Sequence, residues 1–525
     1  MSPRTLMRLA VTGGRSDTVR IALTALGAAL GTIALLATAT VLAIVSPKTV
    51  QIMADGTRVE EYANLDRYTN ELLNEPGLRP GVAVALLLFT VPILAFVAQC
   101  GKLGAPARER RLAAFRMAGA TPRQVVWIAA AETGVAAVLG AALGIAVFLA
   151  GRVALDQPDG LGRRPLPTDV LPDWPAFAAV AAGLPLMVTL LAVVTLRRVV
   201  VTPLGVVRTT TRSAPLPWPG LLIGAGIGLY AVVEPIDRML FAGSMPAEML
   251  VALMLAGLVL VSVGVVTGVG WLTHFTGRLL HRFARRSATL LAGRRMMADP
   301  WAGSRTFAAL LVALLLGAMI AGVHAWTMTD VEANSLAMKR YAELSGEPYR
   351  PVEDAFYARA YELIDYALLI AVAIAALGLL VALADGIVTR RRTLTALIAG
   401  GASRGVLSRA LAWQVLTPAV PAIAIAVSAG IVLPRRLIRQ VQSGTMGGDI
   451  CRPAAGDLAG ACADPKYFEA HRVYLETAPV TLDVPVPWEH LALLGGAAVV
   501  AVLVVTAVGL LFVRMSTNVN ELRTG

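Results

Sequence analysis

The 525-residue sequence has little charge, few aromatic residues and only three cysteines. Charged residues make up 15% of the chain and aromatic residues 6%, whereas 57% are hydrophobic, and the mean hydropathy is +0.69. A soluble globular domain has a higher proportion of charged residues and a lower proportion of apolar residues. These proportions therefore exclude an ordinary soluble protein. We therefore interpret the chain as an integral membrane protein.

The sequence also lacks the side-chain sets that support common chemistries. Its five histidines and few cysteines form no convincing metal-binding pattern. The apolar segments contain no paired carboxylates or Ser/His/Asp set, which argues against an intramembrane enzyme. A Gly-x-x-x-x-Gly-Lys-Ser/Thr phosphate loop is missing, since the glycine spacing before Gly101-Lys102 is wrong. We expect this chain to bind no metal and no cofactor, and to catalyse nothing by itself.

Long hydrophobic runs dominate the rest of the sequence. About ten of them reach or approach the roughly 20 residues that a membrane-spanning helix needs, and the run near 217–233 is the weakest because it is short and rich in glycine. The predicted spans lie near 18–45, 81–99, 125–150, 175–195, 217–233, 249–271, 306–326, 363–384, 408–433 and 490–513.

Basic clusters decide the predicted orientation. If the N-terminus is cytoplasmic, every basic cluster falls on the cytoplasmic side, as the positive-inside rule requires. An even number of spans then places both termini in the cytoplasm. The net charge of +12 also suggests nucleic-acid binding, but membrane topology accounts for it more simply. We expect a multi-pass protein of a bacterial plasma membrane without a nucleic-acid partner.

One basic motif occurs twice and organises the chain. Its first copy covers 108–125 and its second covers 390–407, an offset of 282 residues. Each copy joins two apolar segments and is expected to form a helix, a turn and a second helix. The matched pairs are Arg110 with Arg392, Leu112 with Leu394, Gly119 with Gly401, Ala120 with Ala402, and Thr121 with Ser403.

The turn of this motif has its own chemistry. Gly119, and either Gly400 or Gly401 in the second copy, suits the left-handed position that ends a helix, because glycine has no Cβ to clash there. Thr121 and Ser403 can each cap the helix that follows. A glutamine three residues after Thr121 completes a capping box, whereas the second copy has valine there. Each copy therefore predicts a sharp reversal at the membrane surface.

A second pair of landmarks supports an internal duplication. The segments 202–209 and 517–524, which follow the fourth and tenth spans, align at an offset of 315. Landmarks that recur in the same order predict two parallel four-helix repeats with spans five and six between them. The fold class is thus an all-α polytopic membrane protein. Its predicted parts are a first repeat at 1–209, two linker helices at 210–275 and a second repeat at 276–525.

The predicted outer loops are modest in length, and none is long enough for a large independent domain. They either contact a substrate or partner, or merely cover the helices, and the acidic loop at 46–80 is a candidate for a short amphipathic helix. Cys451 and Cys462 share the last loop and either form a disulfide or remain free thiols. The loops lie at 46–80, 151–174, 327–362 and 434–489.

Taken together, these motifs resemble a known family. Two four-helix units, each with a basic helix and a Gly-Ala-Thr/Ser turn between its second and third helices, are similar to FtsX-like permeases of ABC transporters, the MacB-type or type VII group. Glu132 in the helix after the turn and the Pro-Leu tail from Pro203 also match. The second repeat is looser, with Gln414 in place of Glu132. The ten-helix layout is similar to bacitracin-efflux permeases, which carry a large outer domain between spans seven and eight that is missing here.

The resemblance implies a mechanism. In such families a separate ATPase dimer, which binds ATP and magnesium, docks on the turns, and its closure is transmitted through the helices to the outer face. It implies two ATPase subunits per chain and export of, or mechanical work on, an amphipathic or lipid-associated substrate. The alternative is an FtsX-type regulator that transmits the motion to a cell-envelope hydrolase. A secondary transporter would need charges at mid-membrane, where the spans have few.

The resemblance assigns roles to particular residues. The basic residues near the turns either contact the ATPase or only anchor lipid headgroups and set topology. Residues 1–20, which hold four arginines, are read as an amphipathic lead-in helix to the first span. Glu132, and Gln414 in the second repeat, are read as structural polar groups inside the membrane. Glu132 would form a hydrogen bond or ion pair near the cytoplasmic boundary, for example with a basic residue of the lead-in helix, and a proton or substrate role is the alternative. The coupling candidates are Arg108, Arg110, Arg111, Arg116, Gly119, Ala120, Thr121, Arg390, Arg391, Arg392, Gly401, Ala402, Ser403 and Arg404.

Overall fold

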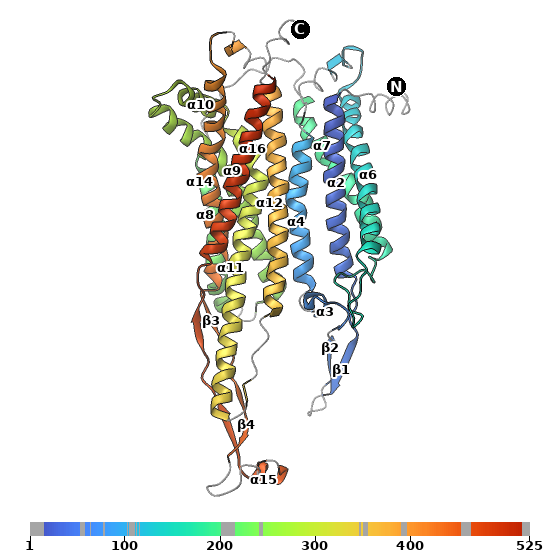
Figure 1. Cartoon of the computed structure of the whole chain (residues 1–525), viewed down its shortest axis with the longest axis vertical. Coiled ribbons are helices and arrows are strands. Elements are labelled where there is room, and N and C mark those ends of the chain that lie inside the picture. The colour runs from blue at the N-terminus through green and yellow to red at the C-terminus, as the bar shows by residue number, and fades with distance from the viewer. Residues whose placement is uncertain are drawn as a thin grey trace.

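The architecture comes from a computed structural model and is a bundle of long helices (Figure 1). Ten of the helices in the described residues are long and apolar enough to cross a membrane. This confirms the all-α polytopic fold. The structure describes residues 15–52, 58–62, 65–76, 79–101, 103, 111, 113–114, 116–200, 216–240, 245–345, 348–349, 355–389, 396–398, 400–452, 462 and 464–516.

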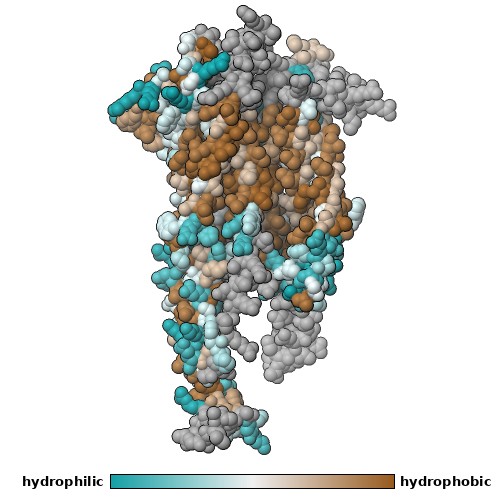
Figure 2. Space-filling model, viewed as in Figure 1, coloured by the Kyte–Doolittle hydropathy of each residue, from teal (hydrophilic) through white to brown (hydrophobic). Residues whose placement is uncertain are grey.

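The spanning helices fall into three sequential groups. The first repeat contains α2 (Arg15–Leu42), α4 (Arg79–Cys100), α6 (Pro122–Ala154) and α7 (Trp174–Val200). The linker contains α8 (Trp218–Leu240), α9 (Ala247–Arg282) and the short α10 (Ser287–Ala298). The second repeat contains α11 (Pro300–Ser345), α12 (Ala355–Thr389), α14 (Arg404–Leu437) and α16 (Trp488–Ser516). Figure 2 shows the apolar band that these helices present, with hydrophilic residues beyond both of its edges.

The two repeats pack in the same way. In the first, α2 packs on α4, α6 and α7; in the second, α11 packs on α12, α14 and α16. Close backbone approaches occur in both repeats: a Cβ at Gly144 of α6 would lie 2.6 Å from the carbonyl oxygen of Ala29, and one at Gly430 of α14 would lie 2.4 Å from that of Leu315. Small residues let membrane helices approach this closely. The duplication read from the sequence is therefore present in the helix packing.

The repeats meet through their second helices. α4 packs on α12, and Ile93 and Phe96 of α4 share a buried cluster with Ile374 and Val381 of α12. The linker helix α9 packs on α11 and α14, and α8 packs on α14. The linker pair thus extends the second repeat. The boundary expected at 275 falls inside α9, because this helix continues beyond its apolar stretch to Arg282.

Both turns of the duplicated motif lie at the same end of the bundle, at the top of Figure 1. α2 begins there, α4 and α12 end there, and α6 and α14 begin there. We call this end the turn side and the opposite end the far side.

The far side of the first repeat corrects one expectation. Part of the 46–80 loop was a candidate amphipathic helix, but the structure has an antiparallel hairpin of β1 (Lys48–Ile52) and β2 (Arg58–Tyr62), then the four-residue α3 (Glu71–Asn74). The β-branched and aromatic residues of both strands favour this hairpin.

The far side of the second repeat is longer than expected. α11 has 46 residues and runs to Ser345, so most of the loop placed at 327–362 is helical; its Ala, Glu, Met, Leu and Lys residues favour a helix despite their polarity. Two antiparallel ribbons extend beside it (Figure 1). One pairs β3 (Gln440–Gln442) with β6 (Thr481–Asp483), and the other pairs β4 (Gly447–Cys451) with β5 (Arg472–Glu476), with α15 (Pro465–Ala470) between β4 and β5.

Candidate functional site

The two turns have the same backbone geometry. Gly119 and Gly401 both have φ of +91°, in the left-handed region where a side chain is strained. Gly401, rather than Gly400, therefore occupies the helix-ending position of the second copy. The amide of Gly119 donates to the carbonyl oxygen of Arg116, and that of Gly401 donates to Ile398, each at 3.0 Å. Both glycines end a helix with the same local hydrogen bond.

The helix that leaves each turn is capped by a side chain. Thr121 Oγ1 accepts from the Gln124 amide at 3.3 Å, and Gln124 Oε1 accepts from the Thr121 amide at 3.0 Å, which forms a full capping box. Ser403 Oγ accepts from the Val406 amide at 3.4 Å without a reciprocal bond. The cap of the first turn is thus reciprocal, whereas that of the second is not.

Each turn presents its glycine and capping residue outward. Gly119, Thr121, Gly401 and Ser403 are exposed, and a Cβ built on either glycine would meet no atom within 4 Å. The alanines between them are partly buried and anchor the turns. Ala120 packs against the cluster of Val125 and Ala129, and Ala402 against the cluster of Ile387 and Leu407.

Met117 is a further exposed residue of the first turn, with 84% of its surface accessible. The sequence interpretation passed over it, although a methionine two residues before the turn glycine and next to Arg116 was a visible signal. An exposed, flexible apolar side chain of this kind suits contact with another surface.

A buried ion cluster joins the first turn to the lead-in helix. The Glu132 side chain on α6 is 1% exposed, and its Oε2 accepts from Arg20 Nη2 of α2 at 2.8 Å. Its Oε1 accepts from Nη2 of Arg111, in the basic helix before the turn. A carboxylate in this position is costly unless it is paired. Two guanidinium groups satisfy it here, so Glu132 has the structural pairing with the lead-in helix that was expected.

The other predicted residues of the set divide into two groups. Arg116 and Arg404 lie beside their turns with their side chains at least partly exposed. Gln414, at the position of Glu132, is partly buried, and its Oε1 has no hydrogen-bond partner among the described residues. Arg108, Arg110, Arg390, Arg391 and Arg392 lie outside the described residues. Contact of any of these with an ATPase stays a prediction.

Cys451 and Cys462 form a disulfide on the far side, with their Cα atoms 5.8 Å apart. Of the two alternatives left by the sequence, the structure has the bonded one. Because Cys451 ends β4, the bond ties this ribbon to the segment that leads into α15.

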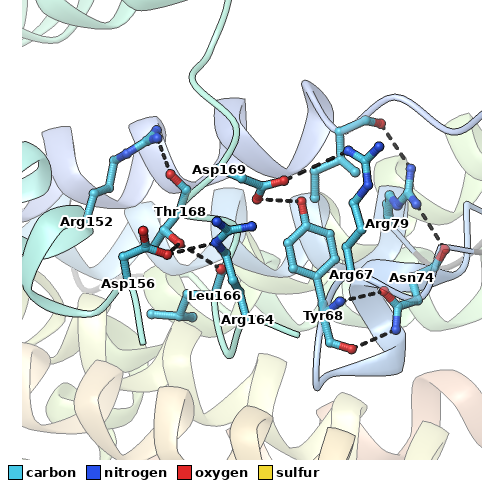
Figure 3. A network of polar contacts seen from close by, with 11 residues as sticks. Arg67, Tyr68, Asn74, Arg79, Arg152, Asp156, Arg164, Leu166, Thr168 and Asp169 are labelled. Carbon is cyan, nitrogen blue, oxygen red and sulfur yellow. Dashed lines mark hydrogen bonds and ion pairs between the residues drawn. The ribbon is translucent and has the colours of Figure 1, made fainter. Parts of the chain in front are cut away.

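A polar network closes the far side of the first repeat (Figure 3). Arg79 at the start of α4 donates to the carbonyl oxygens of Ile44, Leu73 and Asn74 at 2.7–3.0 Å. Tyr68 Oη donates to Asp169 Oδ1 at 3.0 Å. These contacts tie the segment after α2 to the loop between α6 and α7.

The contacts in this network shift the pKa values of two of its side chains. Burial raises the pKa of Tyr68, with the bond to Asp169 as a second cause. The Thr168 hydroxyl and the Arg164 guanidinium, both 2.8 Å from Asp156 Oδ1, lower the pKa of Asp156. The network thus keeps Tyr68 neutral and Asp156 ionised. No sequence motif predicted this network, because its residues are scattered between positions 44 and 170.

The duplicated turns and helices match one family. The description "FtsX-like permease C-terminal" matches residues 83–204 and 366–517, together just over half of the chain. The chain belongs to the FtsX-like permease family. No curated protein matches it significantly.

Family membership agrees with the geometry. Each matched region contains the last three helices of one repeat and the turn between the first two of these, so the permease carries two copies of the family unit. The family comprises membrane subunits of ABC transporters that are normally non-catalytic, and ten apolar helices make this permease a multi-pass membrane protein.

Proposed function

We propose that the permease is the membrane subunit of a bacterial plasma-membrane ABC transporter and that a separate ATPase docks on its two turns. Each turn receives one ATPase subunit, so one permease chain binds two. ATP and magnesium bind to the ATPase. Its closure is coupled to export of, or work on, an amphipathic or lipid-associated substrate at the far side, and the turn side is cytoplasmic.

The observation that carries this proposal is the match between the turns. Gly119 and Gly401 share their φ of +91°, their exposure and their end of the bundle. Two identical subunits of a dimer need two equivalent receptor surfaces, and a duplicated chain supplies both. Met117 and Arg116 offer apolar and cationic groups beside the first turn.

The buried ion cluster offers a route from the first turn into the bundle. Arg111 belongs to the basic helix before the turn, Glu132 to α6 and Arg20 to α2. A push on the turn therefore reaches two spanning helices through side chains that are held together by ion pairs. We propose that Arg111 acts in this internal link in addition to any surface contact.

The test replaces the turn glycines. Gly119→Val and Gly401→Val place a β-branched residue at positive φ, where it is strained by about 1–2 kcal/mol or more, so each turn should change shape. With a coexpressed Walker-motif ATPase encoded beside the gene, we expect at least tenfold lower permease-stimulated ATP hydrolysis, with membrane insertion unchanged.

Gly405→Ala is the matched control, since Gly405 lies near the second turn, has an ordinary φ and leaves open space for a Cβ. Wild-type hydrolysis in both valine variants would refute docking at the turns. Native mass spectrometry of the complex should give one permease chain with two ATPases, and a two-to-two complex would refute the stoichiometry.

The regulator of a cell-envelope hydrolase is a second candidate, favoured by the extension of α11 and the two ribbons on the far side. The two functions separate in vesicles that contain only the permease and its ATPase. ATP-dependent movement of an amphipathic probe would favour the transporter. ATP-dependent activation of an added hydrolase without such movement would favour the regulator.

A further inference from the structure

An apolar cavity of about 210 Å³ lies between the linker and the second repeat. Pro219 and Ile223 of α8, Gly268 and Trp271 of α9, and Ala422 and Ile425 of α14 are among its lining residues. The cavity lies toward the turn side, because α8 begins there at Trp218, itself 43% exposed. Aromatic residues of this kind mark the boundary between membrane and water.

One face of α9 leads from this cavity to the membrane surface. Trp271, Phe275, Arg278 and Arg282 follow one another at spacings of four, three and four residues, which places them on a single stripe of the helix. The rings of Trp271 and Phe275 stack with their centroids 5.4 Å apart, and Arg278 and Arg282 are exposed. Arg278 lies about 10 Å and Arg282 about 16 Å along the helix from Trp271. The stripe thus changes from apolar through aromatic to cationic.

The cationic end of the stripe is broadened by the segment that follows. Arg285, Arg286 and Arg294 are exposed on the turn side, and no acidic residue occurs between 274 and 298. α10 is held against α9 by a close backbone approach, since a Cβ at Gly293 would lie 2.9 Å from the carbonyl oxygen of Gly277. The positive charge is therefore fixed beside the stripe.

We propose that an anionic phospholipid of the turn-side leaflet binds here, with one acyl chain in the cavity and its phosphate against Arg278 and Arg282. The apolar lining excludes a free anion as the main occupant, and the run of arginines favours an anionic headgroup over a zwitterionic one. The order of apolar, aromatic and cationic groups along α9 matches the order of chain, interface and headgroup in a lipid. The site is independent of ATPase docking.

The site belongs to the second repeat alone. α14, which leaves the Gly401 turn, supplies one wall of the cavity, and Ala410 of the same helix packs with Ala288 and Ala292 of α10. The bound lipid therefore touches the helix that connects the second turn to the bundle. Among the described helices, α8 and α9 pack on the second repeat and not on α6.

Tryptophan quenching by brominated lipids tests the proposal. The full-length permease is reconstituted in phosphatidylcholine vesicles that contain increasing amounts of dibrominated phosphatidylglycerol or dibrominated phosphatidylcholine. The signal of Trp271 is the difference between wild type and Trp271→Phe. We expect half-maximal quenching of this signal at a fivefold or more lower mole fraction of the brominated phosphatidylglycerol, because each arginine near the surface contributes about that factor.

Two variants test headgroup binding and acyl-chain binding separately. Arg278→Gln should weaken quenching by brominated phosphatidylglycerol about fivefold and leave quenching by brominated phosphatidylcholine unchanged. The control is Arg123→Gln, which replaces an exposed arginine beside the first turn and should change quenching by neither lipid. Gly268→Leu should fill the cavity, since a Cβ there meets only Pro219 at 3.6 Å, and should lower the Trp271 signal with both lipids by about half or more. Gly224→Leu on the exposed face of α8 is its control.

Equal quenching by the two lipids in the wild type would refute headgroup selection and leave only non-specific boundary lipid. Unchanged quenching in Gly268→Leu would refute occupation of the cavity.

Discussion

The two repeats share a backbone but differ in the polar groups beneath their turns. Gly119 and Gly401 have the same φ, and glycines of α6 and α14 let these helices approach α2 and α11 closely. Beneath the first turn, however, Glu132 forms ion pairs with two arginines, whereas the second repeat has the uncharged Gln414. The comparison teaches that close packing and turn geometry constrain each repeat more tightly than its buried polar contacts do.

The far sides differ even more. The first repeat is closed by short segments and the network around Tyr68, Arg79 and Asp169, whereas the second extends into α11 and two ribbons with a disulfide. The far side of the first repeat is held by hydrogen bonds between several segments, and that of the second by a covalent bond and a continuous helix. The predictions below test these differences, from the largest expected effect to the smallest.

Glu132→Gln makes the first repeat resemble the second. Arg20 is buried and would lose its ion pair with Glu132, so we expect a loss of about 3–5 kcal/mol in the free energy of unfolding. Gln414→Leu should lower the free energy of unfolding by about 1 kcal/mol or less. Denaturant unfolding in detergent, followed by tryptophan fluorescence, measures both. Equal losses would remove the contrast between the repeats, and a double variant with Arg20→Leu should recover part of the loss.

Cys451→Ser together with Cys462→Ser should loosen the far side of the second repeat. The bond closes a separation of 11 residues, for which chain entropy predicts a loss of about 3 kcal/mol, confined to the β4–β5 ribbon. Limited proteolysis from the far side should cut near 451–472 faster in the variant or in reduced wild type. Cleavage in the β1–β2 hairpin serves as the internal reference and should not change.

Gly144→Ala and Gly430→Ala probe what the repeats share. Each new methyl group would lie within 2.6 Å of a backbone carbonyl oxygen, and overpacking of this kind costs about 1–3 kcal/mol. Similar losses in both variants are expected. Gly183→Ala in α7, where a Cβ meets nothing within 4 Å, is the control. A large difference between the two repeats would contradict equivalent packing.

Acidification should weaken the far side of the first repeat. The pKa of Asp156 is lowered by the Thr168 hydroxyl and Arg164, so its stabilising contribution is present above the ordinary aspartate pKa of about 4 and is lost as the pH falls through the lowered value. The hydrogen-exchange protection factors of residues 156–169 should fall between pH 5 and pH 3 by more than they do in Thr168→Val, which lacks one of the causes. Identical pH profiles in the wild type and Thr168→Val would contradict a stabilising role for the Thr168–Asp156 hydrogen bond.

Local features of the fold could be read from the sequence. The turn glycines, the Thr121 capping box and the Ser403 cap depend on residues within a few positions of one another, and the structure has all of them. The spans near 217–233 and elsewhere were visible because a bilayer requires a long apolar run. Pairing of Glu132 with the lead-in helix could be anticipated, because a buried carboxylate needs a cation.

Features that depend on chain segments far apart could not be read in the same way. Arg111 was assigned to the surface, and nothing local showed that the basic helix folds back onto Glu132. The Tyr68–Asp169 contact joins positions 101 residues apart. Hydropathy ended the seventh span near 326, since it registers the membrane boundary and not the end of the helix that crosses it.

The length of α11 has a mechanical consequence. Its 46 residues give a rod of about 69 Å, more than twice the roughly 30 Å of the bilayer core. A tilt of about 10° around the bilayer centre would carry the far end of such a rod through roughly 7 Å. The far end would thus move further than the turn-side end of the same helix, because more of α11 lies beyond the bilayer centre on the far side.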